Sequence, residues 1–278
     1  MPTDPLTITV LDLDAALGGN ADLLIGGGFG LYLKQLHLEQ SDERTLLPRS
    51  RWPRARTTQD IDLFLRAEII IDAERMASYR QAIDQLGFVV EQDAKWLKFA
   101  RQVSGLTVLI DLMVGPLGEL ETKVERRNVR VKPKGTSGLH ARAADDALEV
   151  EHDPLRFPVS DDDRTCEVLI PQAFSFALMK LGALRDRIDD ANKDEGRHHA
   201  LDLYRIMAML TEAEDTAASE LGARHADSPV VVEATRVIDD LIAPAHGLGR
   251  IRLREHPLCP EDADPDWLAN ELRRLILA

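Results

Sequence analysis

The chain has few cysteines, few aromatic residues and no excess of positive charge. Only 2 of its 278 residues are cysteine, which excludes a disulfide scaffold or a cysteine-rich zinc site. The formal net charge of −14 disfavours non-specific binding of nucleic acid over the whole surface, although a local basic site remains compatible with it. The hydrophobic fraction of 44% is that of a globular protein with a substantial core.

Targeting and membrane-spanning signals are also missing from the sequence. No apolar run approaches the ~20 residues that a membrane-spanning helix needs. Residues 1–10 contain one acid and two prolines but no basic stretch followed by a long apolar core, so we expect no signal peptide. These absences predict a cytoplasmic protein without a membrane partner.

The apolar pattern divides the chain into a strand-rich first part and a helical second part. Before residue 165, helices are expected after the glycines within 21–36 and over 73–86, and strands are expected over 61–65, 88–91, 96–100 and 107–114. From residue 170 the spacing becomes helical, with helices expected near 174–181, 201–210, 228–242 and 265–277. Strands followed by helices indicate an α+β fold with a helical C-terminal half. The acidic, proline-punctuated stretch 140–163 suggests two domains, 1–164 and 165–278.

Two aspartates separated by one residue stand inside an apolar stretch. Asp60 and Asp62 would share one face of a strand, because side chains at i and i+2 point the same way. One divalent cation could then bridge them, an arrangement suited to metal-assisted nucleotidyl transfer. A solvated acidic pair is the alternative. Upstream, Gly26-Gly27-Gly28 follows a short apolar run, where glycines allow a tight turn and close approach to a ligand.

A lone acid interrupts the apolar run 107–114. Burying the carboxylate of Asp111 there is costly unless it is paired or binds a cation. The sequence therefore leaves two interpretations open, a third carboxylate of a metal site or a structural aspartate bonded to arginine or to the backbone.

Two further charges are embedded among apolar neighbours on successive expected helices. Lys180 lies on the first of these helices and Asp202 on the next. Charges near a core usually need partners, so the pair is either a structural ion pair between two helices or part of a catalytic site.

Together these motifs resemble the AbiEii-type nucleotidyltransferases. The residues that carry the resemblance are Gly26-Gly27-Gly28, Arg56-x-Thr58-x-Asp60-x-Asp62, Lys180 to Arg187, Lys193-Asp194 and Asp202-Leu203. The family includes toxins of type IV toxin–antitoxin systems, among them mycobacterial enzymes that modify tRNA. Its glycine and Asp-x-Asp part is shared by the whole DNA-polymerase-β-like superfamily.

The resemblance implies a nucleotidyltransferase-like mixed sheet with flanking helices and a role for each motif. The glycine turn would cradle the triphosphate of an NTP, with further nucleotide contacts from Arg56, Thr58 and Arg187. Mg²⁺ or Mn²⁺ would be held by Asp60, Asp62 and Asp111, the last also acting as base. Lys180 would contact phosphate, and Asp202 would support that lysine or contact the nucleotide.

The resemblance predicts an Mg²⁺-dependent enzyme that moves an NMP from an NTP to a hydroxyl acceptor. The acceptor could be tRNA or another RNA, as for a toxin with a cognate antitoxin, and a basic segment could grip it: Arg44, Arg49, Arg51, Trp52, Arg54 and Arg56. That segment could equally be a flexible solvated loop. Two other functions stay open, an adenylyltransferase for a small molecule or a protein, and a non-catalytic nucleotide-binding module.

Overall fold

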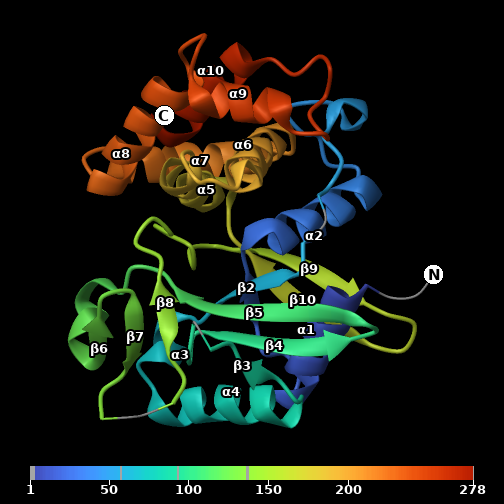
Figure 1. Ribbon diagram of the computed structural model, residues 1–278, viewed down its shortest axis with the longest axis vertical. Helices are drawn as coiled ribbons and strands as arrows, with labels where there is room; N and C mark the ends of the chain where they lie inside the picture. The colour runs from blue at the N-terminus through green and yellow to red at the C-terminus, as the bar shows by residue number, and fades with distance from the viewer. Residues whose placement is uncertain (1–3, 57, 93, 136–137, 278) are drawn as a thin grey trace. The chain divides into compact units, whose positions relative to one another are not determined.

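Figure 1 shows the computed structural model, which describes residues 4–56, 58–92, 94–135 and 138–277. The chain forms two compact units. The sheet unit comprises Met1–Leu33, Thr57–Asp145 and Glu149–Pro171, and the helical unit comprises Lys34–Arg56, Asp146–Leu148 and Gln172–Ala278. The chain passes from the first unit to the second within one helix, α2 (Gly27–Gln40).

The sheet unit is built on one mixed sheet. Its strands are β1 (Leu23–Ile25), β2 (Asp60–Phe64), β3 (Val89–Val90), β4 (Lys98–Val103), β5 (Leu106–Val114), β6 (Val124–Arg127), β7 (Arg130–Pro133), β8 (Ala141–Ala143), β9 (Leu155–Ser160) and β10 (Thr165–Ile170). The accompanying helices are α1 (Pro5–Ala16), α3 (Ala67–Ile70), α4 (Ala73–Gln85) and a 3₁₀ segment, η2 (Gly118–Lys123).

The longest strand, β5, organises the sheet. It pairs in parallel with β2 and β8 and antiparallel with β4, and the strand order is β6-β7-β8-β5-β2-β1-β10-β9, with β3 added to β4. Side chains of β5 alternate between buried Val108, Ile110 and Leu112 and half-buried Leu109, Asp111 and Met113. Such alternation places the apolar core on one face and leaves polar groups on the other.

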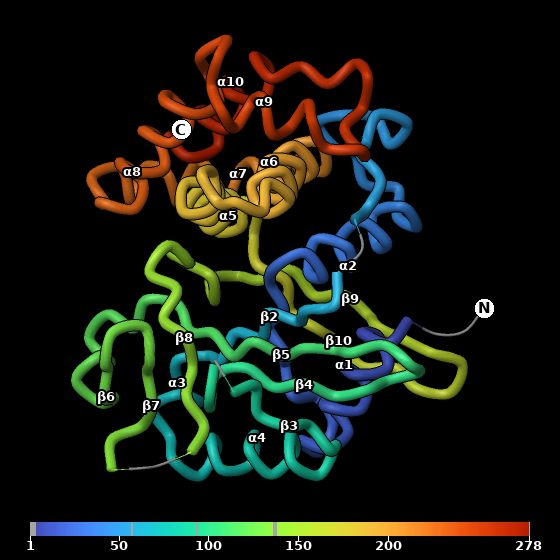
Figure 2. Tube along the Cα trace, in the orientation of Figure 1, coloured from blue at the N-terminus to red at the C-terminus, as the bar shows by residue number. Residues whose placement is uncertain are grey.

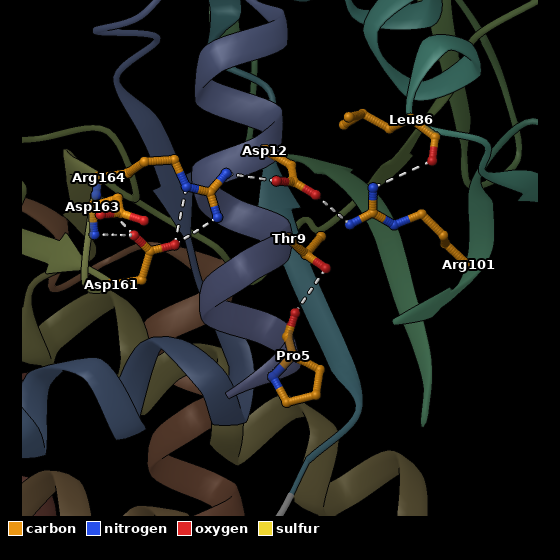
Figure 3. Close-up of polar contacts among 8 residues, drawn as sticks. All are labelled: Pro5, Thr9, Asp12, Leu86, Arg101, Asp161, Asp163 and Arg164. Carbon is orange, nitrogen blue, oxygen red and sulfur yellow. Dashed lines mark hydrogen bonds and ion pairs between the residues drawn. The ribbon is translucent and has the colours of Figure 1, made fainter. Parts of the chain in front are cut away.

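Helix α1 contacts helix α4 and the strands β5, β9 and β10. Figure 2 shows the Cα trace of these elements. A chain of ion pairs fastens α1 to its neighbours (Figure 3). Asp12 receives Arg101 of β4 at 2.6 Å and Arg164 of the β9–β10 turn at 2.7 Å, and Arg164 also pairs with Asp161 at 2.6 Å.

The helical unit contains α5 (Ala173–Arg187), α6 (Lys193–Ala208), α7 (Glu212–His225), α8 (Pro229–Val237), the π-helical turn η3 (Ile238–Ile242), α9 (Leu248–Glu255), α10 (Pro265–Leu277) and the 3₁₀ turn η1 (Arg49–Arg51). Its core lies between α5 and α6, where Phe174, Leu181 and Leu201 are completely buried. No helix in the described ranges combines the length and apolar character needed to cross a membrane.

The predicted α+β class is confirmed, since a mixed sheet is followed by helices. The boundary expected after residue 164 falls in the β9–β10 turn, and β10 stays with the sheet unit because it pairs in parallel with β1. The prediction did not include α1, α7, α9 or the hairpins β6–β7 and β9–β10. Helix α1 escapes periodicity analysis because its buried residues spread around much of its circumference and include the polar Thr7, Thr9 and Asp14.

Candidate functional site

The glycine turn and the Asp-x-Asp strand lie against each other. β1 leads into Gly26, whose N–H donates to the Asp62 carbonyl oxygen at 2.9 Å. Gly27 follows with a φ of +62°, and a Cβ at that position would overlap Oδ2 of Asp62. A residue with a Cβ would therefore be strained at this φ and would have to displace the Asp62 side chain. Since α2 begins at Gly27, the Asp62 carboxylate also lies beside the positive end of the helix dipole.

The three predicted carboxylates lie on one face of two neighbouring strands. Asp62 of β2 stands directly opposite Asp111 of β5 in the parallel register. Asp60 precedes Asp62 by two residues and therefore points to the same side of the sheet. Thr58 supports the start of the strand, because its hydroxyl accepts the Asp60 N–H at 3.3 Å. Thr57, the other threonine of the motif, lies outside the described residues.

Burial dominates the electrostatics of Asp111. It raises the pKa of the Asp111 carboxyl to about 6, with the negative charge of Asp62 adding to the rise and Arg142 opposing it. Arg142 of β8 approaches Asp111 to 3.7 Å, and Lys98 of β4 approaches Asp60 to 3.4 Å. Among the described residues, Oδ1 of Asp60 and Oδ1 of Asp111 are buried without a hydrogen-bond partner.

The carboxylate oxygens of this face are suitable ligands for a hard divalent cation, although they do not form a complete coordination shell. In the described parts of the chain, no three acidic, histidine or cysteine side chains are grouped so as to hold a metal ion together. Mg²⁺, however, commonly takes one or two carboxylates and completes its shell with water and substrate phosphates. The two orphaned oxygens of Asp60 and Asp111 are of the chemical type that Mg²⁺ prefers, and they come from two strands that pair directly.

In the helical unit, a second group of charges surrounds Asp202. Its carboxylate receives Lys180 at 2.8 Å, Arg56 at 3.2 Å and Arg205 at 3.1 Å. Asp202 and Arg205 are fully buried, and Arg205 also donates to the Gln35 side chain at 3.0 Å. Burial alone would raise the pKa of Asp202, but the three cations outweigh it and hold the pKa well below its ordinary value.

The structure thus contains the ion pair between successive helices that the sequence left open. Arg56 joins this cluster, whereas Arg187, the other arginine predicted to bind nucleotide, pairs with Asp190 at 3.0 Å near the end of α5. The predicted site residues accordingly form two groups. Gly26, Gly27, Asp60, Asp62 and Asp111 belong to the sheet unit, as do Gly28 and Thr58, while Arg56, Lys180, Arg187 and Asp202 belong to the helical unit.

The basic segment before Asp60 is folded onto its own unit. The Trp52 indole N–H donates to the Leu47 carbonyl oxygen at 3.0 Å, and Arg51 pairs with Asp262 at 2.8 Å. Arg44, Arg49 and Arg54 remain exposed, and Arg49 donates to the carbonyl oxygens of Glu39 and Ser41. The segment is therefore a structured turn around η1, and these three arginines offer positive charge to a ligand.

Three charged residues of these clusters were not predicted. Arg205 could have been found, because it follows Asp202 by three residues on one helix, a spacing that brings side chains together. Lys98 and Arg142 carry no comparable signal, since only the pairing of β4 and β8 with β5 brings them to the aspartates.

Comparison with known proteins adds no assignment. No protein-family model matches the chain, and the curated proteins contain no significant match.

We predict that Gly27→Ala destabilises the protein more than Gly87→Ala. Both glycines have positive φ, but a Cβ at Gly87 meets nothing within 4 Å. Gly87→Ala should therefore cost only the backbone strain of about 1–2 kcal/mol, and Gly27→Ala at least about 1 kcal/mol more for displacing Asp62. Urea unfolding measures both, and equal losses would contradict the close approach described above.

Asp111→Asn is expected to stabilise the metal-free protein at pH 8. Because burial raises the folded-state pKa to about 6, the ionised carboxylate opposes folding above that pH, by up to about 3 kcal/mol. The gain should shrink as the pH falls from 6 and vanish below about 4, where folded and unfolded states are both protonated. Unfolding in EDTA across this range tests it, with the exposed Asp162→Asn as a control that should show no such profile.

Removing Asp202 should be more damaging than removing Lys180. Asp202→Asn leaves three cations around a neutral buried side chain and should cost about 3–5 kcal/mol. Lys180→Met leaves the carboxylate with both arginines, so we expect a smaller loss. Thermal and urea unfolding of the two variants decide the order, and a larger loss for Lys180→Met would refute this account of the cluster.

Proposed function

We propose that the protein is a nucleotidyltransferase that uses Mg²⁺ or Mn²⁺ to transfer an NMP from an NTP to a hydroxyl acceptor. The observation that carries this proposal is the convergence of two distant motifs. The turn Gly26–Gly28 lies against Asp62, and Asp62 stands beside Asp111 on the neighbouring strand. A phosphate-binding turn next to paired carboxylates is the combination that metal-assisted nucleotidyl transfer requires.

In the proposed reaction, the acceptor oxygen attacks the α-phosphorus of the NTP. A new P–O bond forms, the bond to the leaving pyrophosphate breaks, and the acceptor proton passes to a carboxylate. The resemblance to AbiEii-type enzymes gives Asp111 this last role, and its Oδ1, which lacks a hydrogen-bond partner among the described residues, is open to accept a proton. The bound metal would neutralise charge on the attacking and leaving oxygens.

The sheet unit's own residues would position the nucleotide. Backbone N–H groups at the start of α2 offer hydrogen bonds to phosphate oxygens, and the helix dipole favours negative charge there. Asp60 and Asp62 would hold the metal against those phosphates.

The acceptor we propose is RNA, with tRNA as the first candidate. Arg44 and Arg54 are exposed on the segment before Asp60 and supply positive charge for an RNA backbone. A role as a toxin with a cognate antitoxin, and a cytoplasmic location, are further parts of the proposal. They rest on the sequence resemblance.

A transfer assay tests this function. The purified protein is incubated with each α-³²P-labelled NTP, Mg²⁺ and total tRNA, and with the metal replaced by EDTA. We expect label in RNA that disappears with EDTA. Asp60→Asn and Asp62→Asn should each reduce the rate roughly a hundredfold or more, because metal-bound charge stabilisation contributes several kcal/mol to the transition state.

The exposed carboxylate of Asp162 provides the matched control. Asp162→Asn makes the same chemical change outside the site and should retain the wild-type rate. Label that persists in both Asp60→Asn and Asp62→Asn would reject this site. Pyrophosphate release with small-molecule or protein acceptors, but no label in RNA, would show that the acceptor is not RNA. No transfer to any acceptor would reject the proposed enzyme class.

A further inference from the structure

A row of charges crosses three strands on the carboxylate face of the sheet. Asp62 of β2 is opposite Asp111 of β5, and Asp111 is opposite Lys98 of β4. Directly opposed residues point to the same face, so the lysine extends the row of aspartates. Its Nζ reaches Oδ1 of Asp60 at 3.4 Å. The Arg142 guanidinium, which comes from β8, stands 3.7 Å from Oδ2 of Asp111.

The contacts of Lys98 and Arg142 differ from the structural ion pairs of the same chain. Lys34 meets Glu214 at 2.6 Å and Lys180 meets Asp202 at 2.8 Å, both through hydrogen bonds. The ammonium of Lys98 makes no such bond with Asp60, whose buried Oδ1 lacks a hydrogen-bond partner among the described residues. Lys98 is thus held near Asp60 by charge and not by a hydrogen bond.

Two oxygens of the carboxylate face can still take up a cation. Lys98 and Arg142 approach this face without a hydrogen bond to Oδ1 of Asp60 or Oδ1 of Asp111, and both oxygens are buried without a hydrogen-bond partner among the described residues. The Asp60 side chain is 46% exposed, although Oδ1, the oxygen that Lys98 approaches, is buried. An ion from solution can therefore reach Asp60 and would meet Lys98 at the buried oxygen.

We propose that Lys98 is a positioning residue that competes with a divalent cation for the Asp60 carboxylate. In the metal-free protein, the Lys98 ammonium screens the repulsion among the aspartates and keeps the strand ends ordered. When a divalent cation binds, it displaces the ammonium from Asp60 and leaves Lys98 available to an anionic group such as a phosphate. This inference rests on the proposed function for the identity of the ion as Mg²⁺ or Mn²⁺.

Metal binding, measured without nucleotide, tests the inference. The affinity for Mn²⁺ alone is determined by the electron paramagnetic resonance signal of the free ion at pH 8. We expect Lys98→Met to bind Mn²⁺ about tenfold more tightly than the wild type, because a competing charge close to the carboxylate is removed. Lys98→Arg keeps the charge and should stay within about threefold of the wild type.

Two further variants test whether the gain in Mn²⁺ affinity is specific to Lys98 and depends on Asp60. Lys132→Met removes an ion-paired lysine of the same sheet unit, at 2.9 Å from Glu125, and should leave the Mn²⁺ affinity unchanged. Adding Asp60→Asn to Lys98→Met should abolish the gain in affinity, because the contested carboxylate is lost. Circular dichroism and thermal unfolding confirm that each variant is folded before its affinity is compared.

The possible results separate this inference from the proposed function. Tighter Mn²⁺ binding by Lys98→Met, with no nucleotidyl transfer by the wild type, would support the competition and reject the function. Nucleotidyl transfer by the wild type, with equal or weaker Mn²⁺ binding by Lys98→Met, would overturn the competition and keep the function. A wild type and a Lys98→Met variant that both fail to bind Mn²⁺ would overturn the inference.

Discussion

The parallel pairing of β2 with β5 determines where the charges of the sheet unit lie. Ile61 is opposite Ile110 and Leu63 is opposite Leu112, and all four side chains are buried. The same register brings Asp62 beside Asp111 on the other face. A slip of one residue would exchange the two faces and send the carboxylates into the core, so the apolar pairs specify the position of the acidic ones. The candidate site therefore depends on burial that occurs behind it.

Several groups on the carboxylate face of the sheet lower the stability of the folded protein. Asp111 is ionised against the effect of burial, Asp62 adds a like charge, and Gly27 holds a left-handed conformation so that the Asp62 side chain fits beside it. Proteins tolerate such local conflicts where the surrounding structure compensates for them, and they concentrate at functional sites. Here the compensation comes from the buried side of the sheet and from the ion pairs that tie α1 to β4 and to the β9–β10 turn.

Charge is handled differently in the helical unit. Asp202 is enclosed by hydrogen-bonded cations, and Lys34 and Glu214 form a buried pair beside the Thr211–Glu214 capping box of α7. A buried carboxylate with short, complete contacts orients its neighbours, whereas an aspartate with an orphaned oxygen can still accept a ligand. The sequence could not distinguish a structural from a catalytic role for Lys180 and Asp202. The distinction depends on the residues that contact them, and only the tertiary structure shows these.

Local sequence determined much of the architecture and part of the candidate site. Alternation and helical spacing sufficed for β2, β5, α4 and α10, and the i, i+2 spacing of Asp60 and Asp62 placed both on one face, since these effects act within a single element. Only the tertiary structure decided that Asp62 lies beside Asp111, that Gly27 adjoins Asp62, and that Lys98 and Arg142 approach the carboxylates. Strand order and register arise from burial summed over the whole sheet, and no short stretch of sequence contains that sum.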